Sequence, residues 1–175
     1  MKILIVSDIH GNYNNMQKVL QNDSSFDCLL IVGDILSGPN REGYDPEKLA
    51  ELLNSYKDKI IAVKGNCDYR EDLQLLDFKV DELYKTIPMD NKTILMTHGH
   101  YFNKDHLPDV RYNILITGHT HVPVLERNHN KIILNPGSIS LPRQDSTKSY
   151  IVYEDGVFAL KDLESNKDLE KIYIV

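Results

Sequence analysis

The chain contains no tryptophan and only two cysteines, and none of its apolar runs is long. Runs such as 3–6 and 29–32 fall far short of the ~20 residues that a helix needs to span a bilayer, so we expect no membrane-spanning segment. Cys28 lies in an apolar run and Cys67 in a polar stretch, a pattern that excludes a disulfide framework and a cysteine-based zinc site. Few cysteines, and a start at Met1-Lys2 without the parts of a signal peptide, predict a cytoplasmic protein.

Positive charge is also scarce, since 20 Lys and Arg stand against 26 Asp and Glu, for a net charge of −6. This balance argues against long nucleic acid as a partner, because such binding depends on many phosphate-neutralising cations. What remains is an ordinary globular composition, with 41% hydrophobic residues among 175. A chain of this length buries enough apolar surface for one core, so we expect a single domain over residues 1–175.

Short apolar runs rich in Ile, Val and Leu are typical of strands that are buried on both faces. Five such runs occur, at residues 3–6, 29–32, 60–63, 94–96 and 114–116. Helical periodicity over 14–21 and 46–56 separates the first three, which predicts parallel strands with right-handed crossovers. After residue 110 the expected strands are closely spaced, at 122–126, 131–134, 149–153, 157–160 and 170–175. We expect these later strands to form a second, more antiparallel sheet packed on the first.

Polar residues of a particular kind follow each of the five apolar runs. In an open α/β sheet the carboxyl ends of parallel strands face the ligand crevice, so these side chains should converge. The five segments are Ser7-Asp8-Ile9-His10-Gly11, Gly33-Asp34, Gly65-Asn66-Cys67-Asp68, His98-Gly99-His100 and Gly118-His119-Thr120-His121.

The side chains in these segments are carboxylates, one amide and imidazoles, which are metal ligands. The candidate ligands are Asp8, His10, Asp34, Asn66, His98, His119 and His121. A catalytic zinc usually takes three protein ligands, so this set suits two ions better than one. Mixed oxygen and nitrogen donors favour manganese, iron, nickel, cobalt or zinc over magnesium and calcium.

In order and spacing, the five segments resemble the motifs of the calcineurin-like metallophosphoesterase superfamily. The later Asn135-Pro136-Gly137-Ser138 and Pro142-Arg143, together with the short length, are similar to the small bacterial and archaeal phosphodiesterases of the YfcE type. The resemblance implies an α/β (α+β) fold, a four-layer αββα sandwich of two mixed β-sheets flanked by helices. It also implies a metal-dependent phosphodiesterase in which a hydroxide shared by two divalent ions attacks phosphorus.

The resemblance further assigns roles to individual residues. It implies that Asp8, His10 and His121 hold one ion, that Asn66, His98 and His119 hold the other, and that Asp34 bridges them. Manganese is the first expectation for the cofactor, with nickel, iron, cobalt and zinc as alternatives. The expected catalytic residues are Asp34, Asn66, Cys67, Asp68 and His98, and the expected substrate-binding residues are Asn66, His100 and Arg143.

Cys67 departs from the family pattern, because many members have a histidine there that acts as general acid. A thiol is the weaker acid, with a pKa of about 8.5 against about 6.5 for imidazole, so we expect a preference for acidic leaving groups. Asp68 would orient either Cys67 or a neighbouring histidine. His100 would face the substrate or support a ligand, and Arg143 would pair with phosphate or lie free on the surface.

Two other functions remain open at this stage. One is a phosphomonoesterase, since the same metal centre serves either ester. The other is a non-catalytic protein-interaction scaffold like the retromer sorting subunit, which resembles this subgroup. The expected partner is a small phosphodiester, with neither long nucleic acid nor a membrane. An exposed edge at 171–175 would favour a homodimer or homotetramer.

Overall fold

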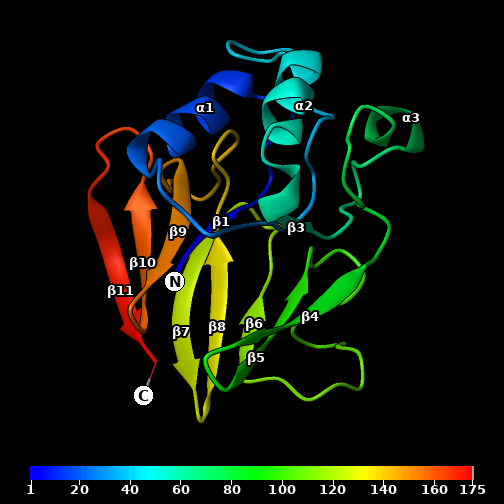
Figure 1. The fold of residues 1–175 in the computed structure, drawn as a ribbon. Helices are drawn as coiled ribbons and strands as arrows, with labels where there is room; N and C mark the ends of the chain where they lie inside the picture. The colour runs from blue at the N-terminus through cyan, green and yellow to red at the C-terminus, as the bar shows by residue number, and fades with distance from the viewer. Residues whose placement is uncertain (175) are drawn as a thin grey trace.

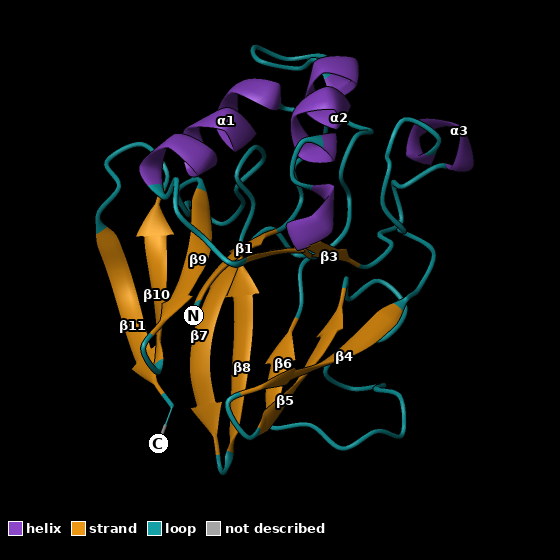
Figure 2. Ribbon diagram, in the orientation of Figure 1, coloured by secondary structure: helices purple, strands orange, loops and turns teal. Residues whose placement is uncertain are grey.

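The computed structural model describes residues 1–174, which form two β-sheets packed face to face with helices on one side (Figures 1 and 2). The first sheet has the strand order β11-β10-β9-β1-β2-β3. Its strands are β1 (Lys2–Val6), β2 (Cys28–Ile31), β3 (Ile60–Ala62), β9 (Ser149–Glu154), β10 (Val157–Asp162) and β11 (Asp168–Tyr173). The β1, β2 and β3 strands are parallel, whereas β9, β10 and β11 pair antiparallel.

The second sheet has the order β4-β5-β6-β8-β7. Its strands are β4 (Tyr84–Met89), β5 (Lys92–Thr97), β6 (Ile114–Ile116), β7 (Pro123–Asn128) and β8 (Lys131–Pro136). The three central strands, β5, β6 and β8, are parallel, and the two edge strands pair antiparallel with their neighbours. Both sheets are therefore mixed.

The two longer helices cover the outer face of the six-stranded sheet, and the short α-helix stands to one side of them (Figure 2). They are α1 (Tyr13–Asn22), α2 (Pro46–Asn54), the 3-10 turn η1 (Lys57–Lys59) and the short α3 (Arg70–Leu73). Asn12 and Asp45 cap α1 and α2, because each side chain accepts a backbone N–H from the first turn. None of the helices described is long and apolar enough to cross a membrane.

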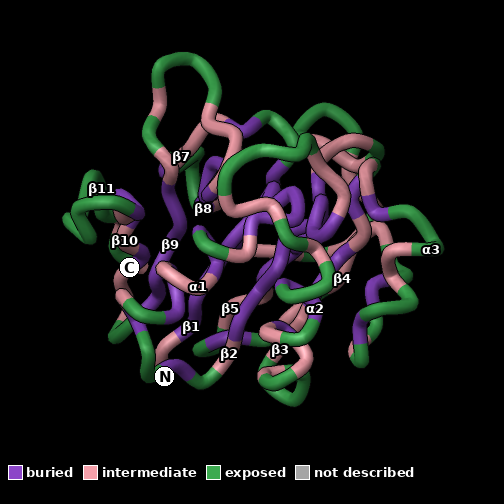
Figure 3. Tube along the Cα trace, turned by 90° about the horizontal axis from the view of Figure 1, so that it is seen from above, coloured by how far each residue is buried: buried purple, intermediate pink, exposed green. Residues whose placement is uncertain are grey.

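Alternate residues of β1 contribute to two separate cores, since successive side chains of a strand point to opposite faces. Leu4 and Val6 pack against the helices, whereas Ile3 and Ile5 pack between the sheets. The central strands are therefore buried on both sides, as the view from above shows (Figure 3). This explains why the sequence of β1 is continuously apolar instead of alternating.

The expected sandwich of two mixed sheets is confirmed, but the membership of one group of strands was predicted wrongly. Residues 149–153, 157–160 and 170–173 were expected in the second sheet, and they extend the first sheet instead, beside β1. The reason is that β1 has a free second edge, which β9 occupies with Lys2 opposite Glu154. Residue 175 of the expected last strand lies outside the described residues. Strand β4 was not predicted from the sequence.

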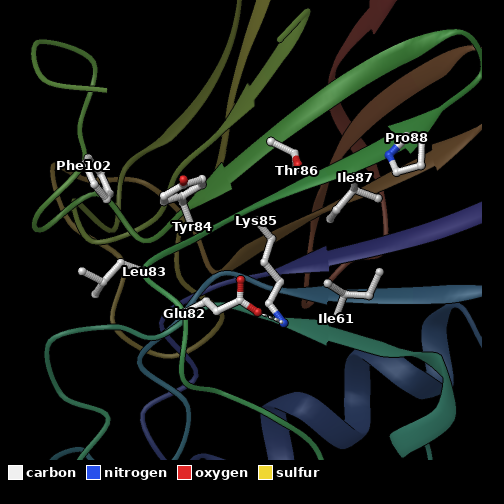
Figure 4. Close-up of a pocket in the computed structure, with 9 residues that line it drawn as sticks. All are labelled: Ile61, Glu82, Leu83, Tyr84, Lys85, Thr86, Ile87, Pro88 and Phe102. Carbon is white, nitrogen blue, oxygen red and sulfur yellow. Dashed lines mark ion pairs between the residues drawn. The ribbon is translucent and has the colours of Figure 1, made fainter. Parts of the chain in front are cut away.

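A cleft of about 650 Å³ lies where the open edges of β3 and β4 approach each other (Figure 4). Ile61 and Ile87 line it, and so do Lys85 and Glu82, which form an ion pair of 3.2 Å. None of the predicted site residues lines this cleft. The candidate chemistry therefore lies elsewhere, at the strand ends.

Candidate metal centre

Five of the predicted ligands follow strand ends in a backbone conformation that L-residues seldom adopt. Asp8, His10, Asp34, His119 and His121 have φ angles of 53°, 48°, 54°, 64° and 60°. A left-handed backbone costs a non-glycine residue energy, and such residues cluster at functional sites. The loops after β1, β2 and β6 thus turn sharply at these residues, and all of them except the exposed His119 are buried.

The first cluster joins the loops after β1 and β6. Asp8 Oδ1 lies 3.0 Å from His121 Nε2 and 3.8 Å from His10 Nε2, and the two Nε2 atoms are 3.4 Å apart. His10 Nδ1 lies 2.8 Å from the Ser37 carbonyl oxygen, and His121 Nδ1 lies 2.7 Å from that of Leu141. A carbonyl only accepts, so each Nδ1 donates, and in the neutral rings the Nε2 lone pairs face each other.

The second cluster lies where β2, β3 and β5 end. Asp34 Oδ2 lies 3.4 Å from His98 Nε2 and 3.7 Å from His10 Nε2, between the two clusters. His98 Nδ1 donates to the Val32 carbonyl oxygen at 2.7 Å, so in the neutral ring its Nε2 is an acceptor. Asn66 Oδ1, also an acceptor, lies 3.2 Å from that Nε2.

With neutral rings, facing acceptors of this kind repel one another unless a proton or a metal cation lies among them. Asp8 Oδ1 is buried and accepts no hydrogen bond from residues 1–174, and an unpartnered buried carboxylate oxygen is costly. The ligand atoms of Asp8, His10 and His121 lie within 4.8 Å of one another, as do those of Asp8, Asp34 and His98. The donor set therefore fits divalent transition-metal cations.

The pKa directions agree with a site that attracts positive charge. Burial would lower the pKa of His98, but its contact with Asp34 and the charge of Asp8 raise it above the usual range. Burial would raise the pKa of Asp34, but His98 and the Cys67 N–H hold it well below the usual range. Asp34 is therefore an anion at neutral pH, as a metal ligand has to be.

Within residues 1–174, the hydrogen bonds of the Asp68 side chain go to backbone groups, whereas the sequence had left Cys67 or a histidine as the group that it would orient. Its buried carboxylate accepts the backbone N–H groups of Asp34, Ile35 and Gly65, at 2.9, 2.8 and 2.7 Å. Burial raises the pKa of Asp68, and the three N–H groups oppose that shift. Asp68 thus joins the loop after β2 to the loop after β3 and fixes the backbone of Asp34.

Cys67 lies beside the second cluster. Its backbone N–H donates to Asp34 Oδ1 at 2.8 Å, and its Sγ lies 3.2 Å from Asn66 Nδ2. Sγ is also within 4.8 Å of the ligand atoms of His10 and Asp34. Burial, together with the charge of Asp34, raises the pKa of the Cys67 thiol to about 11. Without a cation the thiol stays protonated at neutral pH.

The remaining predicted residues, His119, His100 and Arg143, lie beside the two ligand clusters. His119 is exposed, its ring centroid lies 5.2 Å from that of His98, and its backbone N–H donates to Asp8 Oδ2 at 3.0 Å. The ring centroid of His100 lies 5.4 Å from that of His98, and its buried Nδ1 is unpaired within residues 1–174. The exposed Arg143 donates its backbone N–H to the His121 carbonyl oxygen at 3.2 Å.

Two buried serines support Asp8 and were not singled out from the sequence. Ser7 Oγ donates to Asp8 Oδ2 at 2.6 Å, and Ser138 Oγ donates to the Asp8 carbonyl oxygen at 2.7 Å. Ser7 could have been found by its position directly before a ligand. Ser138 ends the Asn135-Pro136-Gly137-Ser138 segment, but its distance in sequence from Asp8 leaves no local sign that the two are in contact.

Two glycines let the loops approach each other closely. A Cβ at Gly65 would lie 2.1 Å from Asp34 Oδ1, and one at Gly118 would lie 2.0 Å from Ser7 Oγ. Both distances are far below contact, so only glycine fits. The Gly-Asn and Gly-His pairs of the sequence motifs therefore have a steric basis.

Comparison with known proteins identifies relatives along nearly the whole chain. The model of the calcineurin-like phosphoesterase superfamily domain matches residues 1–155. The phosphodiesterase YfcE of Escherichia coli (strain K12) is 36% identical over 181 aligned residues, which cover 99% of this chain and 98% of that protein. The solved structure of YfcE, a phosphoesterase from E. coli, superposes with a TM-score of 0.93 at 35% identity and covers 100% of both chains.

A more distant structure shares the fold alone. Vps29 from Entamoeba histolytica, solved in complex with Zn²⁺, superposes with a TM-score of 0.69 at 20% identity over 100% of both chains. At this identity the likeness carries no statement about activity. The shared fold thus also occurs in a protein that was solved with zinc.

Proposed function

This chain belongs to the calcineurin-like phosphoesterase superfamily, and we propose that it acts as a metal-dependent phosphodiesterase on a small phosphodiester. The observation that carries the proposal is the presence of two pairs of facing acceptors, His10 Nε2 with His121 Nε2 at 3.4 Å and His98 Nε2 with Asn66 Oδ1 at 3.2 Å. In the neutral rings each pair brings two lone pairs together, an arrangement that a bound cation would stabilise. A scaffold would have no need to retain two such costly arrangements.

The proposed centre binds two divalent ions, with manganese as the first expectation and nickel, iron, cobalt or zinc as alternatives. Asp8, His10 and His121 would hold one ion. Asn66, His98 and His119 would hold the other, and the place of Asp34 between the clusters supports its role as the shared ligand. When bound, the ions would neutralise charge on the phosphate and supply an activated water.

The side chains around the ions have separate tasks. His100, with its unpaired buried Nδ1, and Asn66 would hydrogen-bond phosphate oxygens, and Arg143 would pair with them through its guanidinium. Cys67 would donate the proton that the leaving oxygen needs. Asp68 would contribute to catalysis through the backbone, by keeping Asp34 in place.

We also propose a cellular compartment, a class of partner and an oligomeric state for the enzyme. Two cysteines without a disulfide suit a cytoplasmic protein, and a net charge of −6 suits a small substrate instead of long nucleic acid or a membrane surface. Strand β11 is a sheet edge with Leu169 and Tyr173 exposed, which favours a homodimer or homotetramer. Light scattering during size-exclusion chromatography would measure the oligomeric state.

The test compares metal-stripped protein before and after addition of Mn²⁺, with bis(4-nitrophenyl) phosphate as substrate. We expect hydrolysis only with metal, and its loss in His98→Ala. The matched control is His129→Ala, because His129 is an exposed histidine in the turn between β7 and β8. Circular dichroism would show that the variant is folded.

Two outcomes would overturn the proposal. Stoichiometric metal binding without hydrolysis would indicate the scaffold function. Faster hydrolysis of 4-nitrophenyl phosphate than of the diester, in parallel assays, would indicate a phosphomonoesterase.

A further inference from the structure

A second hollow, of about 230 Å³, adjoins the first metal-ligand cluster. His10 forms part of its lining, and so does Leu141, whose carbonyl oxygen fixes the ring of His121. The other walls come from α1, from the loop between β2 and α2, and from the loop between β8 and β9. The remaining lining residues are Asn12, Asn15, Pro39, Arg41, Glu42, Ser140 and Lys148.

The side-chain amide of Asn15 is more than nine-tenths buried, yet its hydrogen bonds are weak. Its Nδ2 lies 3.4 Å from Ser140 Oγ, and its Oδ1 lies 3.4 Å from Lys148 Nζ. Normal hydrogen bonds of this type are about 2.9 Å long. Ser140 Oγ meanwhile donates to the Ile9 carbonyl oxygen at 2.7 Å. Asn15 therefore retains capacity to bind a group placed in the hollow.

The hollow also has more cationic than anionic charge. Lys148 Nζ lies 3.5 Å from Glu164 Oε1, but Lys18 forms the shorter ion pair with the same carboxylate, so two ammonium groups share one anion. Arg41 forms no ion pair with residues 1–174. Glu42 is the one carboxylate in the lining, and its backbone oxygen accepts from Asn12 Nδ2 at 2.9 Å.

We propose that this hollow is a subsite for a second anionic group of the substrate, a carboxylate or a phosphate, bound by Asn15, Arg41 and Lys148. The inference rests on the proposed function. Because His10 lines both the hollow and the metal centre, a phosphodiester at the metals can extend one ester group into it. The preferred substrates are thus phosphodiesters that carry a further negative charge.

The experiment uses the Mn²⁺-loaded protein and four 4-nitrophenyl phosphodiesters that differ only in the second ester group. That group is n-butyl, 3-carboxypropyl, 3-phosphonopropyl or choline. Since every substrate releases 4-nitrophenol, differences in kcat/KM report on the second group. We expect the anionic substrates to exceed n-butyl by about tenfold, and choline to fall below it, because a charge-assisted hydrogen bond is worth about that factor.

Variants assign the preference to the hollow. Arg41→Met and Lys148→Met should each lower the ratio of kcat/KM between the anionic and n-butyl substrates, chiefly through KM. Lys57→Met, a control at an exposed lysine outside the hollow, should keep that ratio. In metal-free protein, NMR shifts of the Asn15 side-chain amide on titration with glutarate, absent in Lys148→Met, give a readout that needs no activity.

The outcomes separate the two proposals. Equal kcat/KM for anionic and n-butyl substrates, or an unchanged ratio in both variants, overturns the subsite while the phosphodiesterase stands. No hydrolysis of any substrate overturns the phosphodiesterase, and the glutarate titration then decides whether the hollow binds anions.

Discussion

The Asp68 carboxylate accepts the backbone N–H of Asp34 at 2.9 Å, across 34 residues of sequence. The same carboxyl group accepts from Gly65 at 2.7 Å, so one buried side chain joins the loops that carry two predicted metal ligands, Asp34 and Asn66. Groups that support metal ligands in this way affect affinity without touching the metal.

Asp68→Asn should lower Mn²⁺ affinity by about 10–100-fold, because an amide offers one acceptor oxygen where the carboxylate offers two. Isothermal titration of metal-stripped protein measures the affinity. Asp58→Asn, at an exposed aspartate, is the matched control and should leave it unchanged. An Asp68→Asn protein that is folded and binds Mn²⁺ as tightly as the parent would show that the loops keep their positions without this carboxylate.

Gly118→Ala should lower the free energy of unfolding by about 1–3 kcal/mol, because overpacking forces neighbours to move. The added methyl would lie 2.0 Å from Ser7 Oγ and 3.0 Å from Asp8 Oδ2. Urea unfolding measures the loss. Adding Ser7→Ala should recover part of it, since the hydroxyl in the way is gone. Strictly additive losses in the double variant would place the strain elsewhere.

Cys67→His should raise activity on alkyl phosphodiesters relative to aryl ones. An alkoxide leaving group needs a proton and imidazole is a stronger acid than a thiol, whereas a nitrophenolate leaves without one. General acid catalysis is worth about 10²–10⁴-fold, so a relative gain of at least about tenfold is expected. Parallel kcat/KM measurements on a methyl and a 4-nitrophenyl diester give the ratio of alkyl to aryl activity, which is then compared between the variant and the parent. An unchanged ratio would remove Cys67 from the proton-transfer role.

Asp23 should stabilise the fold at neutral pH and not in acid. Burial would raise its pKa, but Lys2, Tyr150 and Lys161 together lower it. The unfolded chain then binds the proton more readily, so this contribution is complete above about pH 4 and is lost as pH falls through the folded-state pKa.

Asp23→Asn should therefore cost about 1–3 kcal/mol of unfolding free energy at pH 7, and less at pH 3. Lys2 Nζ and Lys161 Nζ lie 2.7 and 3.1 Å from the carboxylate, and both lose their anion in the variant. Urea unfolding at the two pH values measures the difference. An equal cost at both would mean that the effect is one of packing and not of charge.

Much of the fold and site followed from local sequence. The apolar runs that became β1, β2, β3, β5 and β6 were recognisable because a strand buried on both faces has to be apolar throughout. The ligand residues after them were recognisable because the carboxyl ends of parallel strands face a common crevice. Each of these two signals is contained in a stretch of only a few consecutive residues.

Other features depend on contacts between distant parts of the chain, which no local pattern encodes. Only the tertiary structure decided that β9 pairs with β1, and that the carbonyl oxygens of Val32, Ser37 and Leu141 fix the orientation of three histidines. It likewise decided that Asp68 connects two loops, and that Asn15, Arg41 and Lys148 line one hollow. The sequence determined which chemical groups are present at the strand ends, and long-range packing determined what each of them contacts.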